Sequence, residues 1–166
     1  QVRVNAEVEF DPAGKFVRCF GTVQDITRQR ELERTLGRAE SLLEDISRLT
    51  HVGGWEVSLP SGNPIWTSQV RRIFEADDSF EPTNEVSSKL LRAEALELVN
   101  SSIRDAMLLT RPFDIEYDAV TFRGNEVRLR SIGRPEQVDG RTVRIFGTLE
   151  DVTARRKVEA ERRRYE

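Results

Sequence analysis

The sequence has one cysteine and one histidine among its 166 residues, and it contains no long apolar run. A single thiol, Cys19, cannot form a disulfide within the chain or build a cysteine-based zinc site. Such cysteine usage suits a reducing cytosol. No apolar stretch approaches the roughly 20 residues that cross a membrane, and no signal peptide is recognisable. We expect a cytoplasmic region of a longer protein, since Gln1 is not a methionine, and a membrane anchor elsewhere in that protein is compatible with this expectation.

Signatures of catalysis and of nucleic-acid binding are scarce as well. The formal net charge is −3, and the basic run near the C-terminus is interleaved with glutamates, which does not indicate nucleic acid as a partner. Two carboxylate pairs, Asp77 with Asp78 and Glu94 with Glu97, have no histidine or cysteine partners for metal or hydrolytic chemistry. No glycine-rich phosphate loop and no nucleophile–base set is evident. We therefore expect neither catalysis nor a metal site.

A duplicated segment is the strongest feature that the sequence does contain. The stretch "GTVQDITRQRELE" near the N-terminus is matched by "GTLEDVTARRKVE" near the C-terminus, at an offset of 126 residues. That offset is the size of a domain, far longer than the repeat of a solenoid. The identical positions are Gly14/Gly140, Val17/Val143, Arg18/Arg144, Phe20/Phe146, Gly21/Gly147, Thr22/Thr148, Asp25/Asp151, Thr27/Thr153, Arg30/Arg156 and Glu33/Glu159.

Both copies predict a hairpin followed by a departing helix. A glycine turn precedes an alternating strand, and a threonine then stands where a helix N-cap belongs. We interpret residues 1–27 as the C-terminal hairpin of an upstream domain and residues 50–153 as a complete second domain. We expect the isolated hairpin either to pack poorly or to borrow a surface, because a lone hairpin is marginal in water. Its predicted apolar face comprises Val4, Phe16, Phe20 and Val23.

The two segments that follow the hairpins predict linker helices, over residues 28–49 and from residue 154 to 166. In the first linker, apolar residues are spaced by 4, 3, 4 and 3, as in the seam of a coiled coil. Either an amphipathic helix packed on its own domain or a parallel dimeric coiled coil fits this pattern, and Gly37 weakens the helix. The seam residues are Leu32, Leu36, Ala39, Leu43 and Ile46.

The second unit reads as an α+β domain with an antiparallel sheet. A tryptophan-containing hairpin over residues 55–66 is followed by a short helix at 68–75 and a loop-like stretch. A longer helical stretch over 85–109 is expected to break near Arg92 or Ala93. Three strands then close the unit, at residues 113–121, 126–137 and 142–152.

Three stretches of residues 50–153 carry a resemblance to a known family: "HVGGWEV", "IWTSQVRRIF" and "DGRTVRIFGTLEDVT". They resemble a PAS domain with its C-terminal PAC motif, and the second occurrence of the last stretch strengthens the match. The resemblance implies a five-stranded antiparallel sheet with helices on one face, flanked by the linker helices. Many relatives carry His-Pro-Asp-Asp before the long helix, whereas this chain has "LRAEALELV" there, so the role of that histidine is not carried over.

The resemblance implies a sensory or signalling module similar to those of tandem PAS proteins, such as bacterial two-component sensor histidine kinases and diguanylate cyclases. The implied partners are a second copy in a homodimer and the adjacent PAS and effector domains of the parent chain. The implied relay residues, where sheet meets helix, are Asp151 and Thr153 with their copies Asp25 and Thr27. A plainer interpretation is that these residues only end a strand and cap a helix.

Cofactor binding receives little support from the sequence. His51 precedes the first strand instead of lying on the long helix, Met107 fits core packing, and Cys19 is replaced by Ile145 in the second copy. We therefore expect no heme and no covalently bound flavin, although a small organic ligand remains open.

Four residues are candidate contributors to a ligand pocket: Trp66, Tyr117, Arg128 and Arg130. Strand alternation places both arginines on one face of the strand and Val127 and Leu129 on the other. If Val127 and Leu129 face the core, the arginines point outward. An inward arginine would instead favour a carboxylate ligand. Three functions follow as hypotheses: a dimeric relay module, a small-molecule receptor and a structural spacer without ligand.

Overall fold

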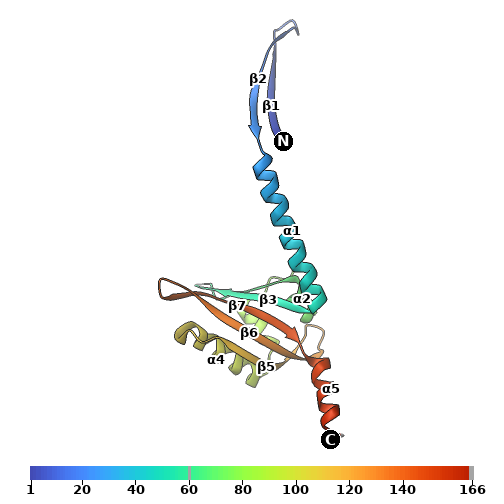
Figure 1. The fold of residues 1–166 in the computed structure, drawn as a ribbon, viewed down its shortest axis with the longest axis vertical. Helices are drawn as coiled ribbons and strands as arrows, with labels where there is room; N and C mark the ends of the chain where they lie inside the picture. The colour runs from blue at the N-terminus through green and yellow to red at the C-terminus, as the bar shows by residue number, and fades with distance from the viewer. Residues whose placement is uncertain (60, 165–166) are drawn as a thin grey trace. The chain divides into compact units, whose positions relative to one another are not determined.

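The computed structural model describes residues 1–59 and 61–164. The chain divides into two compact units, Gln1–Asp45 and Ile46–Glu166, each described here by itself. Among the described residues, no helix combines the length and the apolar character needed to cross a membrane. Figure 1 shows the course of the chain from its N-terminal hairpin to its C-terminal helix.

The first unit begins with the expected hairpin. Strand β1 (Val2–Phe10) pairs antiparallel with β2 (Phe16–Asp25), and helix α1 (Thr27–Thr50) follows. The connecting loop is closed by Asp11, whose Oδ1 accepts hydrogen bonds from the backbone N–H groups of Ala13 and Lys15, each at 2.9 Å. The predicted linker helix at 28–49 thus corresponds to α1.

The two faces of this hairpin differ from the prediction. Val4 lies opposite Val23, whereas Phe20 lies opposite Glu7. Successive side chains of a strand point to opposite faces, so Phe20 and Val23, three positions apart, cannot share one face. The expected grouping was therefore wrong for Phe20, which lies on the opposite face. Phe16 stays with the valines, because it pairs with Phe10 beyond a register shift, and Phe10 shares the face of Val4 in β1.

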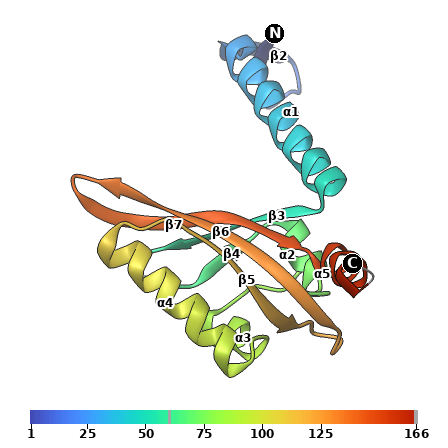
Figure 2. The ribbon, with the colours of Figure 1, turned by 60° about the horizontal axis from the view of Figure 1, so that its bottom comes forward.

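The second unit is built on a five-stranded antiparallel sheet in the order β4-β3-β7-β6-β5. The long β6–β7 hairpin turns at Asp139 and Gly140, whose φ angles of +50° and +76° suit a tight two-residue turn. The sheet confirms the predicted α+β class and antiparallel topology (Figure 2). The strands are β3 (Val52–Ser58), β4 (Pro64–Trp66), β5 (Phe113–Val120), β6 (Glu126–Val138) and β7 (Arg141–Asp151).

Four helices accompany this sheet: α2 (Ser68–Ile73), α3 (Asn84–Lys89), α4 (Ala93–Leu109) and α5 (Thr153–Arg164). The break between α3 and α4 falls where it was predicted: α3 ends at Lys89 with Leu90 as its C-cap, Leu91 bridges to Ala119 of β5, and α4 begins at Ala93. Arg92 is the N-cap residue of α4, and its guanidinium forms an ion pair with Glu126. Of the predicted linker at 154–166, residues 165 and 166 lie outside the described residues.

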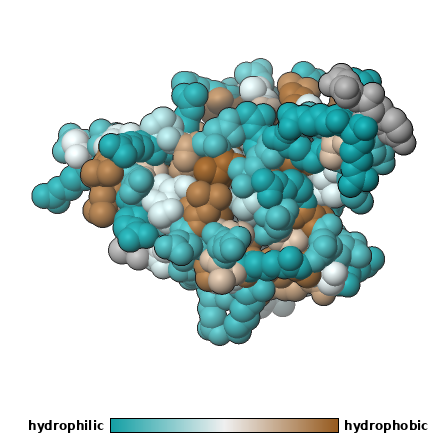
Figure 3. Space-filling view, turned by 90° about the horizontal axis from the view of Figure 1, so that it is seen from below, coloured by the Kyte–Doolittle hydropathy of each residue, from teal (hydrophilic) through white to brown (hydrophobic). Residues whose placement is uncertain are grey.

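The core lies between one face of the sheet and the helices α2, α3 and α4. Trp66 stacks on Phe74 with ring centroids 4.9 Å apart, and Val70 and Leu129 are fully buried. Outward-facing side chains of the sheet form ion pairs instead, as where Arg144 lies between Glu56 and Glu136. Figure 3 views the molecule from below, and this face is mostly hydrophilic, with hydrophobic residues in separate groups.

Candidate functional site

A cavity of about 260 Å³ lies within the second unit, between the sheet and the helices α3 and α4. Its lining is mainly apolar and includes Val99, Ile103 and Met107 of α4, facing Trp55 and Leu149 of the sheet. Among the described residues, every side chain that lines it is uncharged. An apolar enclosure with few polar groups is the usual character of a small-molecule site.

Six polar side chains interrupt this apolar lining: Asn84, Ser87, Ser88, Asn100, Tyr117 and Ser131. The Oγ atom of Ser87, on α3, is buried and has no hydrogen-bond partner among the residues that the structure describes. On the sheet side of the cavity, the Tyr117 phenol hydrogen-bonds to Ser131. Burial raises the pKa of this phenol, so it stays neutral. A buried hydroxyl without a partner carries a desolvation cost, so Ser87 is a natural anchor for a polar atom of a ligand.

The structure brings two of the four predicted pocket residues to this cavity. Trp66 and Tyr117 line it, whereas Arg128 and Arg130 lie on the outer face of the sheet. Arg130 donates to both carboxylate oxygens of Asp114, at 2.8 and 2.6 Å. Arg128 pairs with Asp118 at 3.1 Å. A ligand carboxylate held by either arginine in the cavity is thereby contradicted, because Leu129, between them in the strand, takes the core position.

The start of α5 is held by the first residues of β6. Asp151 Oδ1 accepts the backbone N–H of Thr153 at 2.9 Å, and the Thr153 hydroxyl accepts the backbone N–H of Arg128 at 2.8 Å. The carbonyl of Arg128 accepts the N–H of Val152 at 2.8 Å. Thus the relay candidates Asp151 and Thr153 connect two elements, which the sequence alone did not show.

The first copy of this junction has the same arrangement. Asp25 Oδ1 accepts the backbone N–H of Thr27 at 2.9 Å, and Gln1 takes the place of Arg128. The carbonyl of Gln1 accepts the N–H of Ile26 at 3.0 Å. The capping geometry therefore belongs to the duplicated hairpin, including the start of its first strand, and does not need the other three strands of the five-stranded sheet.

A charged cluster ties α5 to the neighbouring strand β5. The Glu116 carboxylate accepts from Arg156 Nε at 2.8 Å and lies within 3.7 Å of Arg128 and 3.9 Å of Arg155. The hydrogen bond from Arg156 lowers the pKa of Glu116 and holds the carboxylate in its charged form. Only 17% of the Glu116 side chain is exposed, so this cluster is less screened than an ordinary surface pair. Sequence reasoning missed Glu116, because its place beside Arg128 and Arg130 is set by the pairing of β5 with β6 and no local pattern indicates it.

The predicted seam of α1 is exposed along its length, and none of the 24 residues of α1 is buried. The exposed fractions are 62% for Leu36 and 67% for Leu43. His51, directly after α1, contributes to a shallow groove with Asp151 and Thr153, away from the cavity. Over residues 1–59 and 61–164, no group of three or more metal-ligating side chains comes together.

Solved structures with the same arrangement come from proteins of several organisms. A sensory box histidine kinase/response regulator from Burkholderia thailandensis is 18% identical with a TM-score of 0.61, over 73% of this chain and 92% of that one. The N-terminal domain of a diguanylate cyclase with PAS/PAC sensor from Marinobacter aquaeolei is 15% identical with a TM-score of 0.57, over 63% of this chain and 98% of that one. A PAS domain from Colwellia psychrerythraea is 14% identical with a TM-score of 0.52, over 68% and 98%.

These similarities show that the chain has the PAS fold, as the sequence predicted. No protein-family profile matches the chain, and no curated protein sequence matches it either.

Proposed function

We propose that residues 46–164 form a sensory module that binds a small uncharged molecule and relays its presence through α5. The observation that carries this proposal is the uncharged cavity with a buried, unpartnered hydroxyl at Ser87. The module itself performs no catalysis; its output passes to an effector domain of the parent protein. The neighbours named for a histidine kinase and a diguanylate cyclase support an output of this kind.

The cavity favours a compact ligand with one polar end. Its volume of about 260 Å³ is just below the range of pockets for drug-sized ligands. An apolar body would contact the α4 side chains, and a single donor or acceptor would reach Ser87 Oγ. A charged group would be left without a counter-ion there, which is costly in an apolar site.

The relay would use the two connections at the start of α5. A shift of β6 changes the position of the Arg128 backbone, which holds Val152 and Thr153. A shift of β5 moves Glu116 and with it Arg156 of α5. Because Tyr117 lines the cavity and adjoins Glu116 in β5, the cavity and the helix share one strand.

Dimerisation through α1 is the second part of the proposal. The exposed seam residues Leu32, Leu36 and Leu43 offer an apolar stripe at heptad spacing. A parallel pair of such helices would place two modules side by side and let a change in one be combined with a change in the other. A structural spacer without ligand is the competing function, and it requires the seam but no ligand-binding cavity.

Replacing Ser87 separates the receptor from the spacer. Ser87→Ala removes a buried hydroxyl without a partner, so the empty protein is expected to keep or gain stability, by up to about 1 kcal/mol. The same substitution is expected to weaken binding of indole, a small uncharged probe with one N–H donor, by roughly fivefold. Thermal unfolding measures the first effect, and titration calorimetry measures the second.

Ser102→Ala is the matched control, because Ser102 lies outside the cavity lining and its hydroxyl already donates to the Leu98 carbonyl at 2.7 Å within α4. It should leave indole affinity unchanged. If neither the natural chain nor Ser87→Ala binds any of a panel of small uncharged compounds, the spacer is the better description.

A further inference from the structure

The N-terminal hairpin matches the last hairpin of the second unit strand for strand. In β1–β2, Val4 pairs with Val23 and Ala6 with Gly21. In β6–β7, Ser131 pairs with Leu149 and Gly133 with Gly147. The first strands correspond at an offset of 127 residues and the second strands at 126, because the connecting turns differ by one residue.

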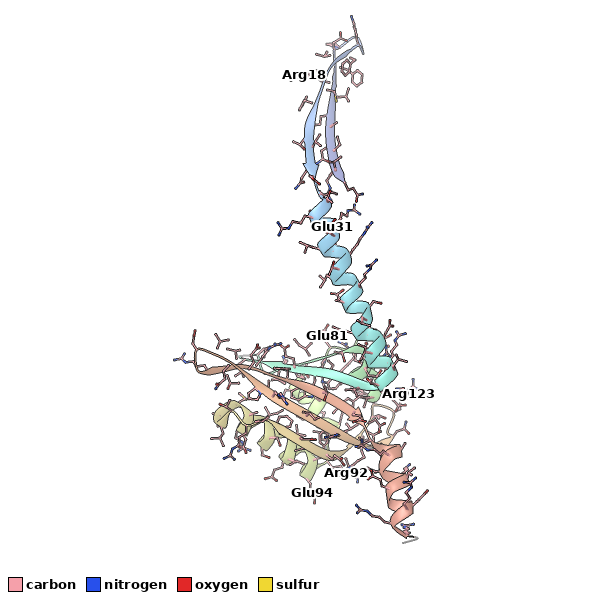
Figure 4. All side chains as sticks on the ribbon, in the orientation of Figure 1. Arg18, Glu31, Glu81, Arg92, Glu94 and Arg123 are labelled. Atoms are coloured by element: carbon pink, nitrogen blue, oxygen red, sulfur yellow. The ribbon has the colours of Figure 1, made fainter. Side chains whose placement is uncertain are left out.

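Side-chain contacts repeat together with this register. The guanidinium of Arg18 lies 5.2 Å from the ring centre of Phe20, and that of Arg144 lies 4.8 Å from the ring centre of Phe146. Both arginines also pair with a glutamate of the preceding strand. Figure 4 labels Arg18 on β2 and shows side chains projecting from both faces of the hairpin.

The equivalent positions differ sharply in burial. Leu149 is 3% exposed, while its counterpart Val23 is 71% exposed. Leu129 is completely buried, while its counterpart Val2 is 57% exposed. The single cysteine, Cys19, is exposed where Ile145 is buried. The first hairpin thus has the face of a domain core, and within Gln1–Asp45 nothing covers it.

A charged group lacks its counterpart in the same way. Arg30 corresponds to Arg156, and both donate their backbone N–H to the carbonyl of the last residue before the helix-starting threonine. Arg156 is paired with Glu116 of β5. The first unit has no strand equivalent to β5, and β5 is the element that supplies the partner of Arg156.

We propose that β1 and β2 are the last two strands of a second domain of the same fold, completed by the chain segment that precedes Gln1. That segment would supply a strand along the free edge of β1, with an acidic side chain facing Arg30. It would also supply apolar helical side chains over Val2, Val4, Cys19 and Val23. This inference concerns the first unit and stands apart from the proposed ligand site.

The preceding segment is favoured over a second copy of the chain by connectivity. In the second unit, β5 reaches β6 through residues 121–125 alone, so the strand that pairs with β6 directly precedes it in the chain. A covalently linked partner is also present at high effective concentration, which a separate chain is not. A second copy would bring only another open hairpin of the same kind.

The test measures maleimide labelling of Cys19 in two chains. One is the 166-residue chain; the other is extended upstream by about 80 residues, the length of Ile46–Asn125 before the matching hairpin. We expect labelling to be at least about 100-fold slower in the extended chain, because Cys19 would occupy a core position like that of Ile145. Peptide-level mass spectrometry assigns the label to Cys19.

The matched control combines Cys19→Ser with Thr22→Cys. Thr22 corresponds to the exposed Thr148, so its label should attach at the same rate in both chains. Equal, fast labelling of Cys19 in both chains would overturn the proposal. Slow labelling of Cys19 in the 166-residue chain would overturn it too. A labelling rate that falls with protein concentration would indicate that a second copy covers the hairpin. A slow rate that is independent of concentration would indicate that the hairpin docks within its own chain.

Discussion

Gly147→Ala is expected to unfold the second unit or leave it marginally stable. A Cβ atom at this position would lie 1.7 Å from the carbonyl oxygen of Ile132 and 2.8 Å from its carbonyl carbon. Both atoms belong to the backbone of β6, so no side-chain rotation can relieve the overlap. The expected loss exceeds about 4 kcal/mol, against a total of roughly 5–15 kcal/mol for a domain of ordinary stability.

Urea denaturation measures this loss of stability, and the near-ultraviolet circular dichroism of Trp55 and Trp66 monitors the unfolding. Gly140→Ala is the control within the same hairpin: its φ of +76° makes alanine unfavourable, but nothing lies within 4 Å. Its expected cost is only about 1–2 kcal/mol. Equal costs at the two positions would show that β6 and β7 do not approach as closely at Gly147 as described.

Leu36→Asp with Leu43→Asp is expected to dissociate the proposed dimer. Each leucine buried in a coiled-coil seam contributes about 1.5–3 kcal/mol, and two carboxylates per helix would instead face each other across the seam. The dimer dissociation constant should therefore rise more than about 100-fold, which corresponds to about 2.8 kcal/mol. Sedimentation velocity over a range of protein concentrations measures the change.

Arg34→Asp with Ser41→Asp adds the same number of carboxylates to α1, away from the seam. This control should leave the association state unchanged, because both positions face away from Leu36 and Leu43 in the heptad. An unchanged association state in the seam variant would show that α1 does not hold the dimer. A natural chain that sediments as a monomer at all concentrations would also contradict dimerisation through α1.

The local elements were predictable because each has a short-range cause. Strand alternation and glycine turns indicated the β6–β7 hairpin, and the threonine before each charged run marked the start of α1 and α5. The break between α3 and α4 was predictable as well, near Arg92. The hairpin of the first unit was predictable from residue identities alone, because its second strand repeats the sequence of β7.

What the sequence left open depends on contacts between distant residues. Glu116 and Arg156 are 40 positions apart, and only the pairing of β5 with β6 brings them together. The unpartnered hydroxyl of Ser87 is defined by what does not reach it, which no local pattern reveals. Phe20 was assigned to the wrong face of the first hairpin because it was grouped with Val23 by hydrophobicity, although strand alternation puts residues three positions apart on opposite faces.

The central claim is that the state of the cavity is communicated to α5 through β5. Hydrogen exchange at the start of α5 tests it most directly, in the natural chain, in Ser87→Leu, in Glu116→Gln and in the double variant. Ser87→Leu places an apolar side chain in the cavity and mimics an occupant. We expect Ser87→Leu to change the amide exchange rates of residues 153–158 at least about threefold in the natural chain. The change should be much smaller when Glu116→Gln is also present. Exchange in α5 that is indifferent to Ser87→Leu in both backgrounds would contradict the claim.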